Sequence, residues 1–84
     1  MKILTEQEQK QNKMTELARL RQDVLFEIEK LRAAAVNESS KERSYFLKVD
    51  YRLIDKLHKR MDSMYKVAEA IMDYRDMIQD SIQD

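Results

Sequence analysis

Apolar residues recur at helical spacing along most of the chain and form two long stripes. The first stripe runs from Met14 to Ala35, and the second runs from Leu47 to Ile82, both with gaps of three and four residues. Such gaps place side chains on one face of an α-helix. The Leu47–Ile82 stripe keeps the alternation over five heptads, which is typical of helices in coiled coils and bundles. The pattern therefore predicts two amphipathic helices.

The first helix is predicted over about residues 5–36. Thr5-Glu6-Gln7-Glu8 matches a capping box, in which side chains satisfy free backbone N–H groups at a helix start. Residues 1–12 carry no apolar stripe, so we expect them to fray. Phe26 falls on the outer face, where it is either a single exposed side chain or part of a second contact surface. The apolar face consists of Leu17, Leu20, Val24, Ile28, Leu31 and Ala35.

Asn37-Glu38-Ser39-Ser40 is the one cluster of turn-forming residues. Ser39-Ser40-Lys41-Glu42 matches a second capping box, so we predict a turn at about 37–39 and a second helix over about 40–82. Short connections make helices antiparallel neighbours. The predicted fold is a single all-α domain over 1–84, a two-helix antiparallel hairpin. Because the turn lacks Gly and Pro, one continuous helical rod is the alternative.

The Leu47–Ile82 stripe is wider than contact with a single helix requires. Asp50 and Arg75 interrupt it, and we interpret both as residues that snorkel or lie at a bundle end; the alternative is that they fix register. A flanked stripe predicts contact with more than one helix. The stripe contains Leu47, Asp50, Ile54, Leu57, Met61, Met64, Ala68, Ile71, Arg75, Ile78 and Ile82, flanked by Phe46, Leu53, Val67 and Tyr74 on one side and by Tyr51, Tyr65 and Met72 on the other.

A turn at 37–39 would leave the second helix longer than the first. It would place Ile28 opposite Lys48 and Leu17 near Lys59, so that residues 72–84 overhang by roughly 18 Å at 1.5 Å per residue. Burying such apolar residues is favourable, so we predict a partner for this end. The predicted partner is a second copy, in a homodimeric four-helix bundle or coiled coil, or else a helix of another protein. The predicted interface is Leu57, Met61, Met64, Ile71, Met72, Tyr74, Met77, Ile78, Ile82 and Phe26.

Composition agrees with an all-helical chain and excludes several classes of protein. The 84 residues include no Gly, Pro or Cys, and 38% are charged. Compact β folds need residues that accept positive φ, and disulfide scaffolds and thiolate metal sites need Cys. The sequence contains neither a membrane-spanning apolar run nor an apolar signal segment, so we expect a cytoplasmic location. The net charge is zero, which disfavours nucleic-acid binding.

Three polar groups are candidates for chemistry, and for each a solvated surface is the favoured interpretation. His58 has Asp55 and Asp62 at helical spacing and would need further ligands to hold a metal. Glu69, Asp73, Asp76, Asp80 and Asp84 form an acidic row that opposes the dipole at the helix C-terminus and could meet a basic partner or a divalent cation. Lys48, Arg52, Lys56, Lys59 and Arg60 form a basic row that could touch nucleic acid.

No catalytic constellation is visible in the sequence. Ser39 and Ser40 are explained as helix caps, and a phosphate-binding loop needs glycines that this chain lacks. No pair of carboxylates lies in an apolar setting that would raise the pKa of one of them. We therefore predict no enzyme activity and no catalytic, cofactor-binding or metal-binding residues.

Three segments resemble the long stalk helices of CorA-type magnesium channels. They are Leu17-Ala18-Arg19-Leu20-Arg21, Tyr45-Phe46-Leu47 and Tyr74-Arg75-Asp76-Met77-Ile78. The resemblance implies helices that pack into an oligomer, as the stalks of that family do. The family's Gly-Met-Asn signature, membrane spans and preceding α/β domain have no counterpart in this sequence, so the resemblance does not imply transport.

These observations leave four functions open. The first is a non-enzymatic protein–protein interaction or structural module that self-associates through its apolar stripe. The second is a small regulator or inhibitor, of the kind found in phages and mobile elements, that binds and blocks another protein. The third is a nucleic-acid-associated helical protein, and the fourth is a fragment similar to a cation-channel stalk.

Overall fold

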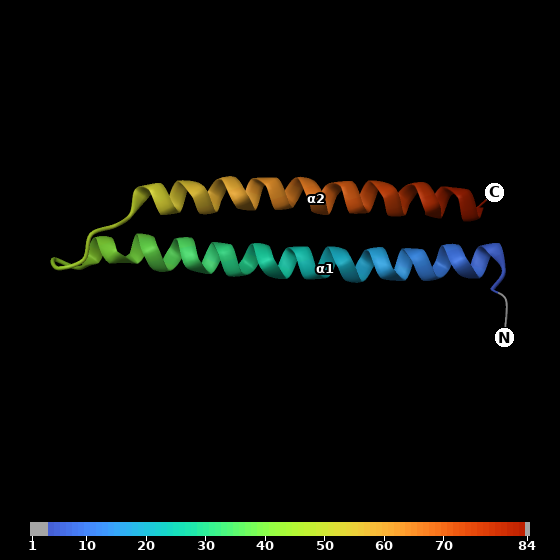
Figure 1. The fold of residues 1–84 in the computed structure, drawn as a ribbon, viewed down its shortest axis with the longest axis horizontal. Coiled ribbons are helices and arrows are strands. Elements are labelled where there is room, and N and C mark those ends of the chain that lie inside the picture. The colour runs from blue at the N-terminus through green and yellow to red at the C-terminus, as the bar shows by residue number, and fades with distance from the viewer. Residues whose placement is uncertain (1–3, 84) are drawn as a thin grey trace.

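The protein is a two-helix hairpin. The computed structural model describes residues 4–83 and contains α1 (Glu6–Ser39), a short 3-10 helix η1 (Ser40–Arg43) and α2 (Tyr51–Gln83), with no strand among these residues. The two long helices lie side by side and antiparallel, with the connection at one end and both termini at the other (Figure 1). The predicted all-α hairpin is therefore confirmed.

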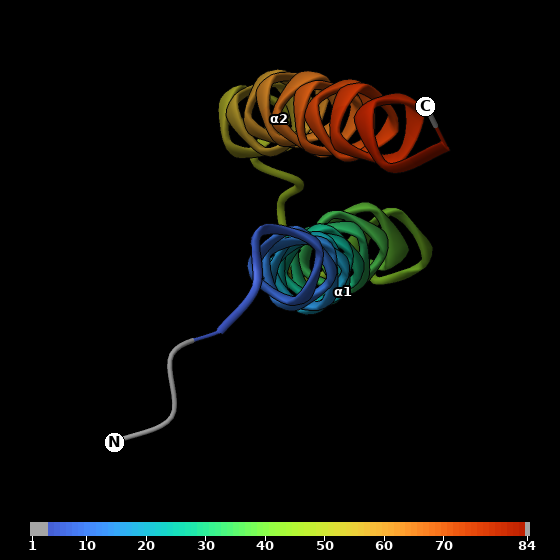
Figure 2. The same cartoon turned by 90° about the vertical axis from the view of Figure 1, so that its right-hand side faces the viewer.

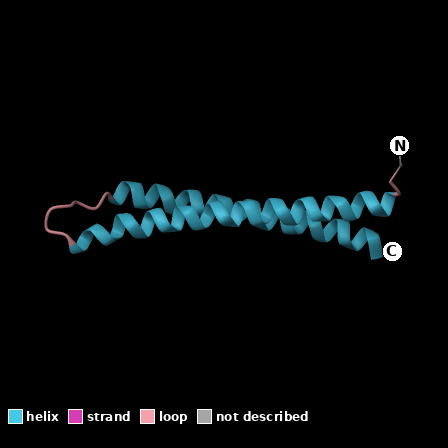
Figure 3. Ribbon diagram, turned by 90° about the horizontal axis from the view of Figure 1, so that it is seen from below, coloured by secondary structure: helices cyan, strands magenta, loops and turns pink. Residues whose placement is uncertain are grey.

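The hairpin is a thin rod rather than a globule. It measures 64 × 25 × 14 Å and has a radius of gyration of 19.4 Å, against about 12 Å for a compact domain of this length. The helix axes are inclined to each other, as the end-on view shows (Figure 2), and they cross when the molecule is seen from below (Figure 3). A two-layer rod of this kind leaves much of each helix facing water.

The core is a single row of side chains between the two helices. Ile28 is the most deeply buried large residue, with 1% of its surface exposed. Ala35 from α1 and Met61 from α2 pack with it, and Val24, Leu25, Leu31, Leu57 and Met64 pack around them. Met14, Leu17, Ala68 and Ile71 continue the buried row towards the open end of the hairpin. Apart from Leu25, these are residues whose spacing predicted amphipathic helices. The prediction is wrong for Leu20, which is 49% exposed because it lies about 80° round the helix from Ile28 at 3.6 residues per turn.

The start of α1 follows the predicted cap. The Thr5 hydroxyl oxygen accepts a hydrogen bond from the Glu8 backbone N–H at 3.1 Å, and the hydroxyl donates to the Glu8 carboxylate at 3.3 Å. Residues 6–12, which we expected to fray, are helical in the structure. Residues 1–3 of that predicted segment lie outside the described part of the chain.

The turn predicted at 37–39 is in the wrong place. Ser39 keeps helical dihedral angles and makes no capping bond with its side chain. The hydroxyls of Ser39 and Ser40 instead donate back to the carbonyls of Val36 and Asn37 at 3.0 and 2.8 Å. Serine can bond either to a following N–H group or to a preceding carbonyl, and here the second choice lets α1 continue. The connection therefore falls at residues 40–50.

The second helix begins at Tyr51 rather than at residue 40. The Asp50 carboxylate accepts a hydrogen bond from the Leu53 backbone N–H at 3.0 Å, which is the bond of an N-cap residue. Leu47 and Asp50, which the sequence placed in the Leu47–Ile82 stripe, both precede the helix. Asp50 therefore lies at the end of the helix pair, which is one of the two positions predicted for it, and there its side chain caps α2 instead of snorkelling from the seam.

The predicted overhang of residues 72–84 is also wrong. With the connection at 40–50, α1 and α2 have 34 and 33 residues, so their lengths match. Arg32 donates a hydrogen bond to the Tyr65 hydroxyl, and Ile82 lines a groove with residues between Leu4 and Asn12. The first turns of α1 thus cover the last turns of α2. Asp84 lies outside the described residues.

Candidate interaction surface

Most of the predicted interface residues pack inside the hairpin. Met61 and Ile71 are buried, and the others in this group are half-buried. We call the α2 residues that face α1 the hairpin seam: Ile54, Leu57, Met61, Met64, Ala68, Ile71, Arg75, Ile78 and Ile82. Met72 lies on its flank. Within a single chain, α1 already covers much of this apolar surface.

The remaining predicted interface residues are exposed. Met77 is 68% exposed, Tyr74 is 47% exposed, and Phe26 on α1 is 63% exposed. The Lys30 ammonium lies 4.8 Å from the centre of the Phe26 ring and also pairs with Glu27 at 3.1 Å, so Phe26 has local partners on its own helix. Tyr74 and Met77 are therefore the members of the predicted interface that stay most open for a partner on α2.

Tyr74 and Met77 belong to a second apolar row on α2. Val67, Ala70, Tyr74 and Met77 follow gaps of three and four residues, and we call this row the second stripe. Each member precedes a hairpin-seam residue by one position, which turns it away from α1 by about 100° at 3.6 residues per turn. Val67 is 50% exposed. An apolar row that no helix of the same chain covers is a candidate interaction surface.

The tip of the hairpin carries two aromatic side chains that lie within the range predicted for the second helix but outside α2. Tyr45 is 100% exposed, Phe46 is 95% exposed and Leu47 is 56% exposed. Phe46 and Leu47 were assigned to the second helix because they continue its spacing. The signal that could have corrected this is Asp50, a preferred N-cap residue directly before a helical run. The tip is thus a second exposed apolar feature, separate from the second stripe.

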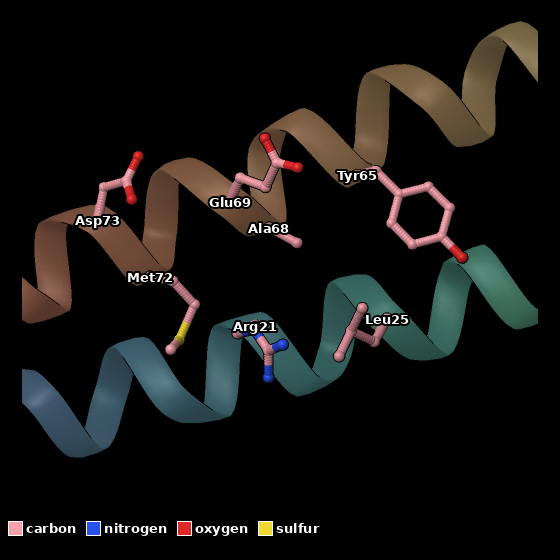
Figure 4. Close-up of a pocket in the computed structure, with 7 residues that line it drawn as sticks. All are labelled: Arg21, Leu25, Tyr65, Ala68, Glu69, Met72 and Asp73. Carbon is pink, nitrogen blue, oxygen red and sulfur yellow. The ribbon is translucent and has the colours of Figure 1, made fainter.

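One edge of the hairpin has a shallow groove of about 310 Å³ (Figure 4). Arg21 and Leu25 from α1 and Met72 and Ala68 from α2 point into it, whereas the carboxylates of Glu69 and Asp73 point away from α1. Tyr65 completes the lining. The lining provides apolar contact and guanidinium donors, and it includes no histidine, serine or cysteine that would act as a base or nucleophile.

Two arginines interrupt the core beside this groove. Arg21 and Arg75 are half-buried and together line an adjoining groove of about 500 Å³. The Nε atom of each is buried and has no hydrogen-bond partner in the described part of the chain. Two arginine side chains thus take positions in the row between the helices that apolar residues fill around Ile28.

A buried carboxylate ties α1 to the connection. Glu38 is 6% exposed; its Oε1 accepts a hydrogen bond from the Asp50 backbone N–H at 3.1 Å, and its Oε2 pairs with Lys41 Nζ at 2.6 Å. The hydrogen bond from Lys41 holds the pKa of Glu38 below its ordinary value, with the Asp50 N–H acting in the same direction. Nearby, the Tyr51 hydroxyl donates to Glu42 at 2.7 Å, which raises the pKa of Tyr51.

The candidate metal ligands are not brought together. Among residues 4–82, no group of three or more histidine, cysteine or carboxylate side chains is placed to hold a metal ion. Asp55, near His58, pairs instead with Lys59 at 3.1 Å. Glu69, Asp73, Asp76 and Asp80 are all exposed on α2.

No protein-family model, curated protein or solved structure matches this chain. Neither described helix is long and apolar enough to cross a membrane. The resemblance to CorA-type stalk helices therefore stays a prediction.

Proposed function

We propose that this protein is a non-enzymatic, cytoplasmic interaction module that self-associates through helix packing. The observation that carries the proposal is the second stripe, which runs along α2 at helical spacing and is uncovered in the single chain. Val67, Tyr74 and Met77 are 50%, 47% and 68% exposed. Burying large apolar side chains of this kind favours association by roughly 1.5–3 kcal/mol for each one fully removed from water.

The surface area of the hairpin supports the same proposal. The chain exposes 7136 Å², about a third more than the ~5,300 Å² that scaling gives for a globular monomer of this size. The excess is larger than the ~800 Å² that each partner buries in a standard protein–protein interface. A second copy could therefore cover a full interface, and the hairpin would still expose more surface than a globular monomer of this size.

Sedimentation equilibrium of the full chain over a wide concentration range tests this proposal. We expect a dimer or higher species that dissociates on dilution, with a Kd that Tyr74→Ala raises. Phe26→Ala is the matched control, because it removes an exposed aromatic residue from α1 and leaves the second stripe intact. A folded monomer at the highest concentration would exclude self-association.

A second candidate function is capture of another protein by the tip of the hairpin. Tyr45 and Phe46 are almost fully exposed, and aromatic residues in such positions are common interface anchors. This is the regulator hypothesis with its contact surface moved to the loop. It predicts that Tyr45→Ser with Phe46→Ser abolishes binding to a purified candidate partner and leaves the sedimentation of the chain alone unchanged.

A further inference from the structure

The charged residues beside the second stripe change sign once along α2. Arg52, Lys59, Lys66, Asp73 and Asp80 are spaced seven residues apart, so they lie on one line along the helix. The first three are basic and the last two are acidic, and all five are exposed. The change of sign falls between Lys66 and Asp73, beside Val67 and Ala70 of the second stripe.

The acidic part of this line has no suitable partners within its own helix. Glu69 and Asp73, and likewise Asp76 and Asp80, are four residues apart, where like charges repel. Lys66, Asp73 and Asp80 form no ion pair among residues 4–82, whereas Lys59 pairs with Asp55 at 3.1 Å. Acidic groups near a helix C-terminus also oppose the helix dipole. Cationic groups from another chain would relieve both effects.

The whole of α2 repeats this polarity. Residues 51–66 contain five basic and two acidic side chains, and residues 69–83 contain four acidic and one basic. Two α2 helices in parallel would place like charges side by side. Two α2 helices in antiparallel orientation would place the basic half of each against the acidic half of the other.

We infer that two copies of this chain pair through α2 in antiparallel orientation along the second stripe, with Lys66 of each copy opposite Asp73 of the other. This inference rests on the proposed self-association and specifies its surface and orientation. The same register brings Lys59 of one copy to Asp80 of the other. A two-fold axis relates the copies, so every contact occurs twice.

Side-chain size in the second stripe fits this register. Extended towards the N-terminus of α2, the stripe reaches Ser63, and pairing Lys66 with Asp73 brings Ser63 of one copy next to Tyr74 of the other. Val67 of one copy then meets Ala70 of the other. Large residues thus face small ones, as close packing of helices requires. The Ser63 hydroxyl already donates to the Lys59 carbonyl at 3.1 Å, so burying it leaves no unpaired donor.

Disulfide formation between single-cysteine variants tests the orientation, because the natural chain has no cysteine. Ser63→Cys and Tyr74→Cys would be purified separately, mixed under reducing conditions and then oxidised. Circular dichroism would confirm that each is helical, and sedimentation would confirm that each still associates. A second mixture, of Asp62→Cys and Asp76→Cys, places the thiols on the opposite edge of α2 and is the control.

We expect the mixed 63–74 disulfide to exceed both homodisulfides several-fold, with little cross-linking in the control mixture. If the natural chain is a dimer but the 63–63 and 74–74 species dominate, or no cross-link forms, antiparallel pairing along the second stripe is wrong while self-association stands. If Tyr74→Cys fails to associate, Val67→Cys mixed with Ala70→Cys repeats the test, because these two residues are opposed in the same register. A mixed 67–70 disulfide that exceeds both homodisulfides supports the register, and predominant 67–67 and 70–70 species overturn it. A natural chain that stays monomeric would overturn both proposals.

Discussion

The two apolar rows of α2 have the same spacing and opposite surroundings. In the hairpin seam, Met61, Ala68 and Ile71 are 8%, 4% and 8% exposed. In the second stripe, Val67, Tyr74 and Met77 keep about half or more of their surface in water. One row packs against α1, whereas the other stays largely open in the single chain. Periodicity therefore identifies an apolar face, but it does not determine whether the face is covered within the chain.

The largest expected difference between the two rows is in folding stability. Ile71→Ala should lower the free energy of unfolding by about 2–4 kcal/mol, because it removes buried atoms and leaves a cavity. Met77→Ala should change it by no more than about 0.5 kcal/mol, since the side chain is largely exposed. Urea denaturation followed by circular dichroism, at a concentration where the chain is monomeric, measures both. Equal losses of unfolding free energy in the two variants would mean that the hairpin seam and the second stripe contribute equally to folding.

The reverse difference is expected in self-association. Tyr74→Ala should raise the dimer Kd by at least tenfold, because an aromatic residue at the centre of an interface often contributes more than 1 kcal/mol. Phe26→Ala, which removes an exposed aromatic side chain from α1, should leave the Kd within about twofold. Sedimentation equilibrium at several concentrations gives both constants. An unchanged Kd for Tyr74→Ala would remove the second stripe from the interface.

Exchanging the charges of Lys66 and Asp73 tests the proposed register of the two α2 helices in the dimer. Lys66→Asp should raise the dimer Kd by about tenfold, because it sets two acidic pairs against each other in the dimer. Adding Asp73→Lys to the same chain should restore the natural affinity by reversing both partners. The measurement is made at low salt, where exposed ion pairs are least screened. A double variant that associates no better than Lys66→Asp would contradict the proposed register.

The smallest effect concerns the contact that sets where α2 begins. Hydrogen bonding to Lys41 holds the pKa of Glu38 below its ordinary value of 4.5. The folded chain therefore binds fewer protons than the unfolded chain in this range. The resulting stability is fully present above pH 4.5 and is lost as the pH falls through the lowered pKa.

Glu38→Gln removes this titration, so its stability relative to the natural chain should stay constant while the pH is well above 4.5 and should improve as the pH falls below 4.5. Urea denaturation at each pH measures the difference, with exposed Asp23→Asn as the control. A constant difference between Glu38→Gln and the natural chain at every pH would show that the carboxylate does not contribute through its charge.

Much of the fold could be predicted from short-range pattern. The gaps of three and four residues predicted helices and identified Ile28, Met61 and Ile71 as residues of a buried face, and the Thr5 box predicted the start of α1. The interaction surface was predicted less well. Tyr74 and Met77 were predicted as interface residues, which stays a prediction, and they were grouped with seam residues that pack against α1. The exposed tip at Tyr45 and Phe46 was assigned to a helix.

The sequence by itself determined which segments are helical and which of their faces are apolar, because both follow from a local repeat of 3.6 residues. The tertiary structure alone decided the position of the turn, since Ser39 and Ser40 can bond in either direction and the contact between Glu38 and Asp50 joins residues twelve apart. Moving the turn shifted the register of the two helices along their whole length. That shift brought the first turns of α1 over the last turns of α2, so the overhang that a turn at 37–39 would leave does not exist.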